Sequence, residues 1–263
     1  MHPLDRPVWP SLATHRHLAL GDDLARRYAP DVNLFASARD DSDEALAQLA
    51  RLVAPGEQVY VLQVPAIAVP TGLIALKQAR GVQMVASAPI PPEPDTGDMV
   101  SLGDADASEM LALAQLTQPG PFLPRTCQMG QFTGIRIDGR LAAMAGERFR
   151  LSGWTEVSGV CTHPDFRGRG LARRLSRHVA ARIATRGDTA FLHAWRDNTA
   201  AIRLYASLGF AWRSDVNVAV LTRASEQRDH HRAEHNQGAA DQQRQTRTLA
   251  EKHQSQHDHQ RHA

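Results

Sequence analysis

The sequence predicts an α/β protein built on a mixed sheet, and two local patterns carry that prediction. A strand-like stretch, Trp154 to Thr162, runs into a glycine-rich turn and then into a helical stretch, Leu171 to Arg186. Before it, two strand-like stretches meet at Asp138-Gly139, a dipeptide typical of tight hairpin turns. A hairpin followed by alternating strands and helices combines antiparallel with parallel pairing, and its helices cover both faces of the sheet.

Composition narrows the class of protein. The chain has 263 residues, a formal net charge of +2 and 42% hydrophobic residues, which suits a globular core and argues against a dedicated nucleic-acid binder. Its two cysteines, Cys127 and Cys161, form neither a disulfide framework nor a zinc pattern. Residues 1–20 lack the apolar core of a secretory signal, and Val59 to Leu76 reads as a strand and a loop. We therefore expect a cytoplasmic protein without a membrane segment.

Residues 1–98 are expected to form a smaller α/β segment. Its expected helix is Ser42 to Val53, with Ser42 as N-cap, acids in the first turn and Pro55-Gly56 as the stop. Short strands are expected at 31–35, 58–62 and 82–86. The proline-rich stretch Pro89 to Pro94 is interpreted as an interdomain linker.

Residues 99–223 are expected to form the main domain. Its expected elements, in chain order, are a helix at 108–116, strands at 131–137, 141–149 and 154–162, a helix at 171–186, a strand at 190–195, a helix at 198–208 and a strand at 216–221. Residues 224–263 are polar and rich in Gln and His, so they are expected to be a disordered tail. The tail histidines, such as His230 and His257, make a metal site conceivable, but weak adventitious binding or plain solvation is the favoured explanation, and no metal site is expected.

The glycine-rich turn has the chemistry of a phosphate site. Arg167-Gly-Arg-Gly-Leu-Ala172 opens the helix, where main-chain N–H groups have no partner inside the helix and the helix dipole is positive. A second motif follows at Asn198 to Phe210, with Tyr205 inside it and Leu208-Gly209-Phe210 at its end. A dinucleotide fingerprint would need a third glycine and a later acidic residue, which are not found at this spacing.

These two motifs, in this order, resemble those of the GNAT superfamily of acyl-CoA N-acyltransferases. The resemblance covers roughly residues 100–223 and implies acetyl-CoA as the acyl donor. It implies that the pantetheine arm pairs with the main chain of the strand before the turn and that the turn binds the pyrophosphate. Asn198 has two compatible interpretations, an N-cap and an amide that faces the cofactor. The expected cofactor-binding residues are Val160, Cys161, Thr162, Arg167, Gly168, Arg169, Gly170, Leu171, Ala172 and Asn198.

The resemblance also implies catalytic residues. Tyr205 occupies the position that the family uses to protonate the departing thiolate, and a helix aromatic packed on the sheet is the alternative explanation. Glu156 is expected as the general base, acting through water, with its pKa raised by partial burial. His163 and Glu147 are alternative bases. Cys161 is disfavoured as a nucleophile, and His193 is expected to be a packed core histidine.

The predicted function is acetyl transfer to a primary amine of a small molecule or peptide, by direct attack in a ternary complex. The alternative from another class is a non-catalytic acyl-CoA sensor or interaction module. Residues 1–98 resemble the degenerate first half of two-part family members, which forms the acceptor wall or simply packs on the sheet. The sequence names neither the acceptor, the acyl chain length nor the oligomeric state.

Overall fold

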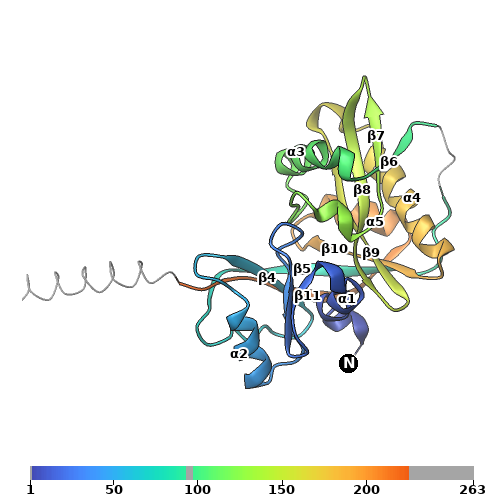
Figure 1. Ribbon diagram of the computed structural model, residues 1–263. Coiled ribbons are helices and arrows are strands. Elements are labelled where there is room, and N and C mark those ends of the chain that lie inside the picture. The colour runs from blue at the N-terminus through green and yellow to red at the C-terminus, as the bar shows by residue number, and fades with distance from the viewer. Residues whose placement is uncertain (1, 93–96, 225–263) are drawn as a thin grey trace, which may run out of the picture.

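An eight-stranded mixed sheet organises the fold (Figure 1). The structure is a computed structural model that describes residues 2–92 and 97–224. The strand order is β4-β11-β5-β10-β9-β8-β7-β6, in which β9 and β10 are parallel and every other described neighbour pair is antiparallel. The strands are β4 (Gln58–Gln63), β5 (Ile74–Ala86), β6 (Met99–Leu102), β7 (Phe132–Ile137), β8 (Arg140–Leu151), β9 (Trp154–Thr162), β10 (Thr189–Trp195) and β11 (Phe210–Thr222). The predicted mixed α/β fold is confirmed.

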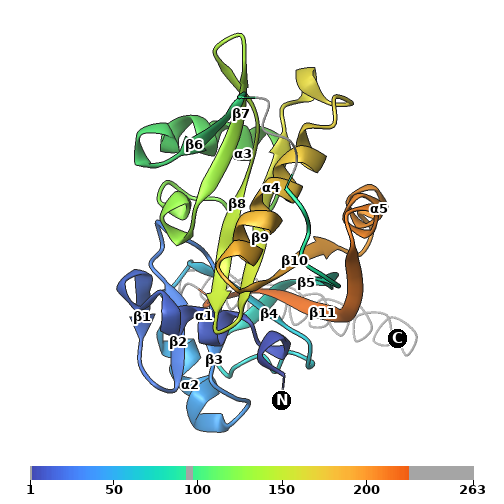
Figure 2. The same ribbon diagram turned by 90° about the vertical axis from the view of Figure 1, so that its right-hand side faces the viewer.

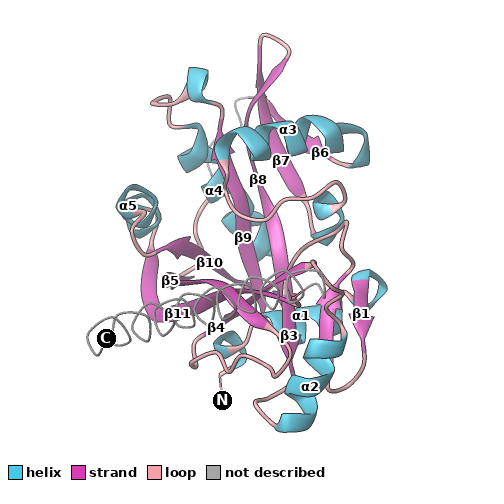
Figure 3. Cartoon of the chain, turned by 90° about the vertical axis from the view of Figure 1, so that its left-hand side faces the viewer, coloured by secondary structure: helices cyan, strands magenta, loops and turns pink. Residues whose placement is uncertain are grey.

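Helices cover both faces of the sheet (Figures 2 and 3). Helices α4 (Leu171–Thr185) and α5 (Thr199–Ser207) share one core with β5, β8, β9 and β10. Helix α3 (Ala107–Thr117) packs on the opposite face of β8 and β9. Helices α1 (Val8–Thr14) and α2 (Asp43–Arg51) and a small sheet of β1 (Ala19–Gly21), β2 (Ala25–Tyr28) and β3 (Ala36–Ala38) pack around the β4–β11 end.

Short 3-10 helices connect these elements at Pro3–Asp5, Arg16–Leu18, Asp104–Asp106, Thr126–Met129 and Pro164–Phe166. Within the described ranges, no helix combines the length and the apolar character needed to cross a membrane.

Most predicted elements lie within a few residues of the observed ones. Ser42 caps α2 as expected, since its side chain accepts a hydrogen bond from the Ala45 N–H. Of the predicted strand at 31–35, only Phe35 pairs, in an isolated bridge with Tyr60, because the N–H groups of Val32 and Asn33 both donate to the Ala29 carbonyl in a turn. Pairing with β2 begins only at Ala36. The sequence shows no clear signal for α1 or for β1, β2, β3 and β6, since strands of three or four residues are too short to show a period.

The N-terminal segment supplies two strands of the large sheet. Strand β4 pairs with β11 at the edge, and β5 lies between β10 and β11. The expected boundary between residues 1–98 and 99–223 therefore falls within one continuous sheet. Part of the expected linker (93–96) and nearly all of the expected tail (225–263) lie outside the described residues.

Strands β9 and β10 pair over only three positions and then separate. Their register runs from Thr189–Trp154 to Phe191–Glu156, and beyond it β10 stays paired with β5 as far as Trp195–Gly81. Strand β9 also carries a bulge, since Gly159 and Val160 together lie opposite the single residue Ala145 of β8. A bulge bends its strand and increases the local twist, so it directs the second half of β9 away from β10.

We expect Gly159→Ala to destabilise the fold. Gly159 has φ +63°, and a Cβ there would lie 2.9 Å from Cε1 of Phe132, a ring that is almost fully buried. Left-handed strain and overpacking together should lower the free energy of unfolding by roughly 2–3 kcal/mol. Urea titration measures the change, with Gly153→Ala as the control.

Gly153 has φ +76° and no neighbour within 4 Å of the added Cβ, so the control carries the strain without the clash. Equal losses in the two variants would contradict a role for the Phe132 contact.

Candidate active site

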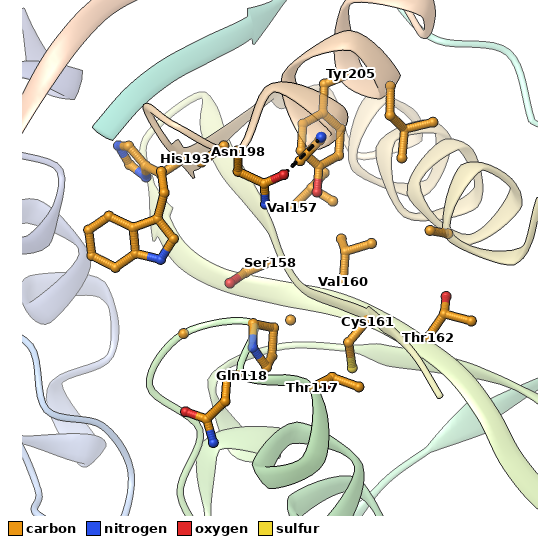
Figure 4. A pocket seen from close by; sticks show the side chains of 18 of the residues that line it. Thr117, Gln118, Val157, Ser158, Val160, Cys161, Thr162, His193, Asn198 and Tyr205 are labelled. Atoms are coloured by element: carbon orange, nitrogen blue, oxygen red, sulfur yellow. Dashed lines mark hydrogen bonds between the residues drawn. The ribbon is translucent and has the colours of Figure 1, made fainter. Parts of the chain in front are cut away.

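A cavity of about 530 Å³ opens where β9 and β10 separate. In the close-up view, β9 crosses the middle of this cavity (Figure 4). Tyr205 of α5 projects from one side, and Thr117 and Gln118 lie on the other side, at the end of α3. Segments from both ends of the chain line the cavity, and the separated strands form its base.

The glycine-rich turn forms one end of the cavity. Gly168 and Gly170 have φ values of +78° and +73°, a conformation that favours glycine, and Gly170 is the N-cap of α4. The first N–H groups of a 15-residue helix therefore face this region together with Arg167. The arrangement fits a diphosphate.

Nine of the ten expected cofactor-binding residues line the cavity: Val160, Cys161, Thr162, Arg167, Gly168, Gly170, Leu171, Ala172 and Asn198. The exception is Arg169, whose guanidinium lies 5.3 Å from the centre of the Phe166 ring. Asn198 is the N-cap of α5, because its side-chain oxygen accepts from the Ala201 N–H at 3.1 Å, and the residue also lines the cavity.

Two ionisable side chains in the cavity remain protonated at neutral pH. Burial raises the pKa of Tyr205 to about 12, with smaller electrostatic contributions from the nearby Cys161 and Glu156. The hydroxyl therefore keeps its proton and can donate it. Burial also raises the pKa of the Cys161 thiol to about 11, so a thiolate nucleophile is disfavoured there. Tyr205 also packs edge-to-face on Phe210 at 6.1 Å, so its ring serves the core as well.

Glu156 is fully buried and lies outside the cavity lining. Arg148 donates two hydrogen bonds to its carboxylate, at 2.8 and 2.7 Å, and Nδ1 of His193 lies 2.7 Å from Oε1. Burial alone would raise the pKa of Glu156, but the charge of Arg148 and these hydrogen bonds lower it to about 2. The expectation of a raised pKa is therefore wrong, since the sequence did not show that Arg148 faces this carboxylate.

A continuous chain of hydrogen bonds extends from Glu156 across the sheet. His193 donates from Nδ1 to Glu156, and the Gln83 amide lies 3.0 Å from His193 Nε2. The orientation of Gln83 is fixed, because its oxygen accepts from Arg213 at 2.7 Å and its nitrogen donates to the Leu4 carbonyl. This leaves Nε2 of His193 as an acceptor. His193 lines the cavity and is not only the packed core residue that the sequence suggested.

The two alternative bases lie elsewhere. Glu147 is buried against Arg182 and Arg186, with oxygen–nitrogen distances of 2.9 to 3.1 Å, and does not line the cavity. His163 accepts from the Asp165 N–H beyond the end of β9 and also lies outside the lining. Neither faces a group bound between β9 and α5.

Among the lining residues that the sequence did not single out, Phe35, Tyr60 and Arg148 form one connected group. Phe35 and Tyr60 pack edge-to-face at 5.8 Å, and the Arg148 guanidinium lies 4.7 Å from the centre of the Phe35 ring. Arg148 had no distinctive signal, because β8 also carries the charged residues Arg140, Glu147 and Arg150. Phe35 and Tyr60 had none, because only tertiary packing brings the N-terminal segment to this site.

The fold and the site together define an acyl-CoA N-acyltransferase architecture. The sequence profile of the FR47-like protein family matches residues 133–219. A solved structure described as a GNAT-family acetyltransferase, from Novosphingobium aromaticivorans, is 43% identical and superposes with a TM-score of 0.80, covering 86% of this chain and 100% of that one. The chain therefore belongs to the GNAT acetyltransferase family.

Two curated relatives match shorter regions. The [ribosomal protein bS18]-alanine N-acetyltransferase of Salmonella typhimurium is 42% identical over 77 residues, which are 29% of this chain and 51% of that protein. Mycothiol acetyltransferase of Thermobispora bispora is 46% identical over 63 residues, which are 23% of this chain and 21% of that protein. The chain thus spans about half the length of the first relative and about a fifth of the second.

We expect the Arg148–Glu156 pair to produce an acid-sensitive part of the stability. The folded pKa of Glu156, about 2, lies below its ordinary value of 4.5, so the contribution is complete above about pH 4.5. It is lost as the pH falls towards 2 and amounts to roughly 3 kcal/mol. Thermal unfolding between pH 5 and pH 2 measures it.

The control is the double variant Arg148→Met with Glu156→Gln, which removes both buried charges together. Its melting temperature should fall less steeply than that of the unchanged protein over the same pH range. Parallel curves would show that the ion pair contributes nothing.

Proposed function

We propose that this protein transfers an acetyl group from acetyl-CoA to a primary amine by direct attack within a ternary complex. The observation that carries the proposal is the cavity where β9 and β10 separate, with a glycine-rich turn and a helix N-terminus at one end and Tyr205 beside it. Membership of the GNAT family supports it. The two curated relatives are named for different acceptors. The acceptor of this protein must therefore be inferred from the residues that line its own cavity.

The main chain of β9 and the turn are proposed to hold the donor. Past Glu156, the edge of β9 that faces β10 has no strand pairing, so it can pair with the amides of a pantetheine arm. The N–H groups from Arg167 to Ala172 would then bind the diphosphate. One N–H near the Gly159 bulge can stabilise the oxyanion that forms on the thioester carbonyl.

Tyr205 is proposed as the acid. As the amine nitrogen forms its bond to the acetyl carbonyl carbon, the carbon–sulfur bond breaks and the thiolate takes a proton from the Tyr205 hydroxyl. Its pKa of about 12 keeps the Tyr205 hydroxyl protonated at neutral pH, so it can donate to the sulfur as negative charge develops there. Because the coenzyme thiol is the stronger acid, the tyrosinate left by this transfer recovers its proton from solvent when the products leave.

Glu156 is proposed to act through His193. Both oxygens of Glu156 already accept hydrogen bonds from Arg148, so the carboxylate is a poor proton acceptor itself. Glu156 accepts the Nδ1 hydrogen of His193 and so orients its ring, which lines the cavity. The amine proton would go to Nε2, in place of the hydrogen bond that this atom accepts from the Gln83 amide. Glu156 is then a positioning residue, and His193 is the group that faces the acceptor.

We expect Tyr205→Phe to lower kcat about 100-fold, because it removes the proton donor but keeps the ring that packs on Phe210. Acetyl-CoA affinity should stay within about twofold. Thiol release with an amine substrate and calorimetric titration with acetyl-CoA measure the two quantities. An unchanged kcat would exclude Tyr205 from the mechanism.

We expect Gly170→Glu to abolish acetyl-CoA binding, since a carboxylate would stand where the diphosphate enters. Gly153→Glu is the matched control, because both glycines have positive φ and no atom within 4 Å of the added Cβ, and Gly153 lies outside the cavity lining. Calorimetry should show binding in the control alone. Binding retained by Gly170→Glu would contradict the proposed turn, and saturable binding to the unchanged protein without thiol release for any amine would favour the sensor alternative.

A further inference from the structure

The cavity presents no negatively charged side chain to an acceptor. Among the described residues that line it there is no Asp, Glu or Lys, and its charged side chains are Arg148, Arg167 and Arg173. Arg167 and Arg173 lie at the turn and at the start of α4, the end proposed to hold the diphosphate. Glu156 is shielded by Arg148 and His193. A second or third ammonium group on an acceptor would find no counter-ion here.

The polar groups left over at the acceptor end are hydrogen-bond donors. Nε and Nη2 of Arg148 engage Glu156, while Nη1 has no hydrogen-bond partner among the described residues and is not buried away from the cavity. The hydroxyls of Tyr60 and Ser158 likewise have no partner in the described chain. These three groups can donate hydrogen bonds to the oxygens of a bound substrate. A carboxylate suits them best, because its charge-assisted hydrogen bonds to a guanidinium are stronger than those of a neutral oxygen.

The same end has an apolar wall. Phe35 and Tyr60 come from the N-terminal segment, and Leu62, Val216 and Val218 come from β4 and β11. Phe35 joins this wall to the hydrogen-bond donor Arg148. The centre of its ring lies 5.8 Å from the centre of the Tyr60 ring and 4.7 Å from the Arg148 guanidinium. Hydrogen-bond donors suited to a carboxylate therefore lie next to an aromatic surface.

We propose that the acceptor is a free α-amino acid with an apolar side chain, whose carboxylate binds Arg148 Nη1 and whose side chain packs on Phe35 and Tyr60. The inference rests on the proposed acetyl transfer and adds the substrate class. The α-amino group of the amino acid then faces His193, and its carboxylate receives hydrogen bonds from Arg148 and the neighbouring hydroxyls. Polyamines and other polycations are rejected because their extra charges would be buried unpaired.

The test compares four amines with the full chain and saturating acetyl-CoA, and follows thiol release. They are phenylalanine, phenylalanine amide, a peptide with N-terminal phenylalanine, and spermidine. We expect kcat/KM for phenylalanine to exceed that for the amide and the peptide about tenfold, the size of one lost charge-assisted hydrogen bond. Spermidine should be at least 100-fold poorer.

Two variants assign the preference to named residues. Tyr60→Phe keeps the ring and removes the hydroxyl, so KM for phenylalanine should rise about threefold to tenfold while KM for the amide stays constant. Arg148→Lys keeps a cation beside Glu156 but loses the forked geometry, so the acid-to-amide ratio of kcat/KM should fall about tenfold. The ratio reports on carboxylate binding, because a merely structural defect lowers both rates together.

The outcomes separate this inference from the proposed function. Acetyl-CoA binding together with equal or better use of the amide, the peptide or spermidine overturns the amino-acid acceptor and leaves acetyl transfer standing. Acetyl-CoA binding with no turnover of phenylalanine also overturns it. A failure of acetyl-CoA to bind the folded protein refutes the proposed function instead.

Discussion

The separation of β9 from β10 is the constraint on which the site depends. The two parallel strands pair over three positions, and β10 then follows β5 while β9 bends at the Gly159 bulge. A parallel pair that continued to the strand ends would fill the space that the cavity occupies. Each strand stays paired along its other edge, β10 with β5 and β9 with β8, and these pairings keep the two strands apart. The fold thus leaves one main-chain edge available without leaving either strand unsupported.

Beneath the cavity, a buried polar chain keeps the charged groups in place. It runs from Arg148 through Glu156, His193 and Gln83 to Arg213, with each contact between 2.7 and 3.0 Å. Burying the Glu156 charge is costly, and the bidentate Arg148 contact offsets that cost. The consequence for chemistry is specific: the carboxylate is fixed and ionised, and its influence reaches the cavity only through neighbours.

The elements in the second half of the chain were predicted well, because the turns and caps that delimit them are specified by neighbouring residues. The hairpin at Asp138-Gly139, the turn at Gly168 to Gly170 and the cap at Asn198 each depend on residues within a few positions of one another. In the first half, the helix at 42–53 and the strands at 58–62 and 82–86 were predicted, whereas α1, β1 to β3 and the start of β5 were not. Strand β5 begins at Ile74, and its exposed first half shows no burial pattern, while Phe35 reaches the cavity only through contacts between distant segments. Charge partners such as Arg148 and Glu156 are fixed by register, which a single sequence does not show.

The N-terminal segment supplies part of the sheet and part of the cavity wall. Strand β5 holds β10 away from β9, and the same segment carries β4, with Tyr60, against β11. Any change in the packing of this segment therefore moves both the opening and its aromatic wall. The aromatic wall and the separation of β9 from β10 thus depend on the same segment, and Gln83 of β5 also contacts His193. The first third of the chain thus acts as a structural part of the site, although it contributes no phosphate-binding turn of its own.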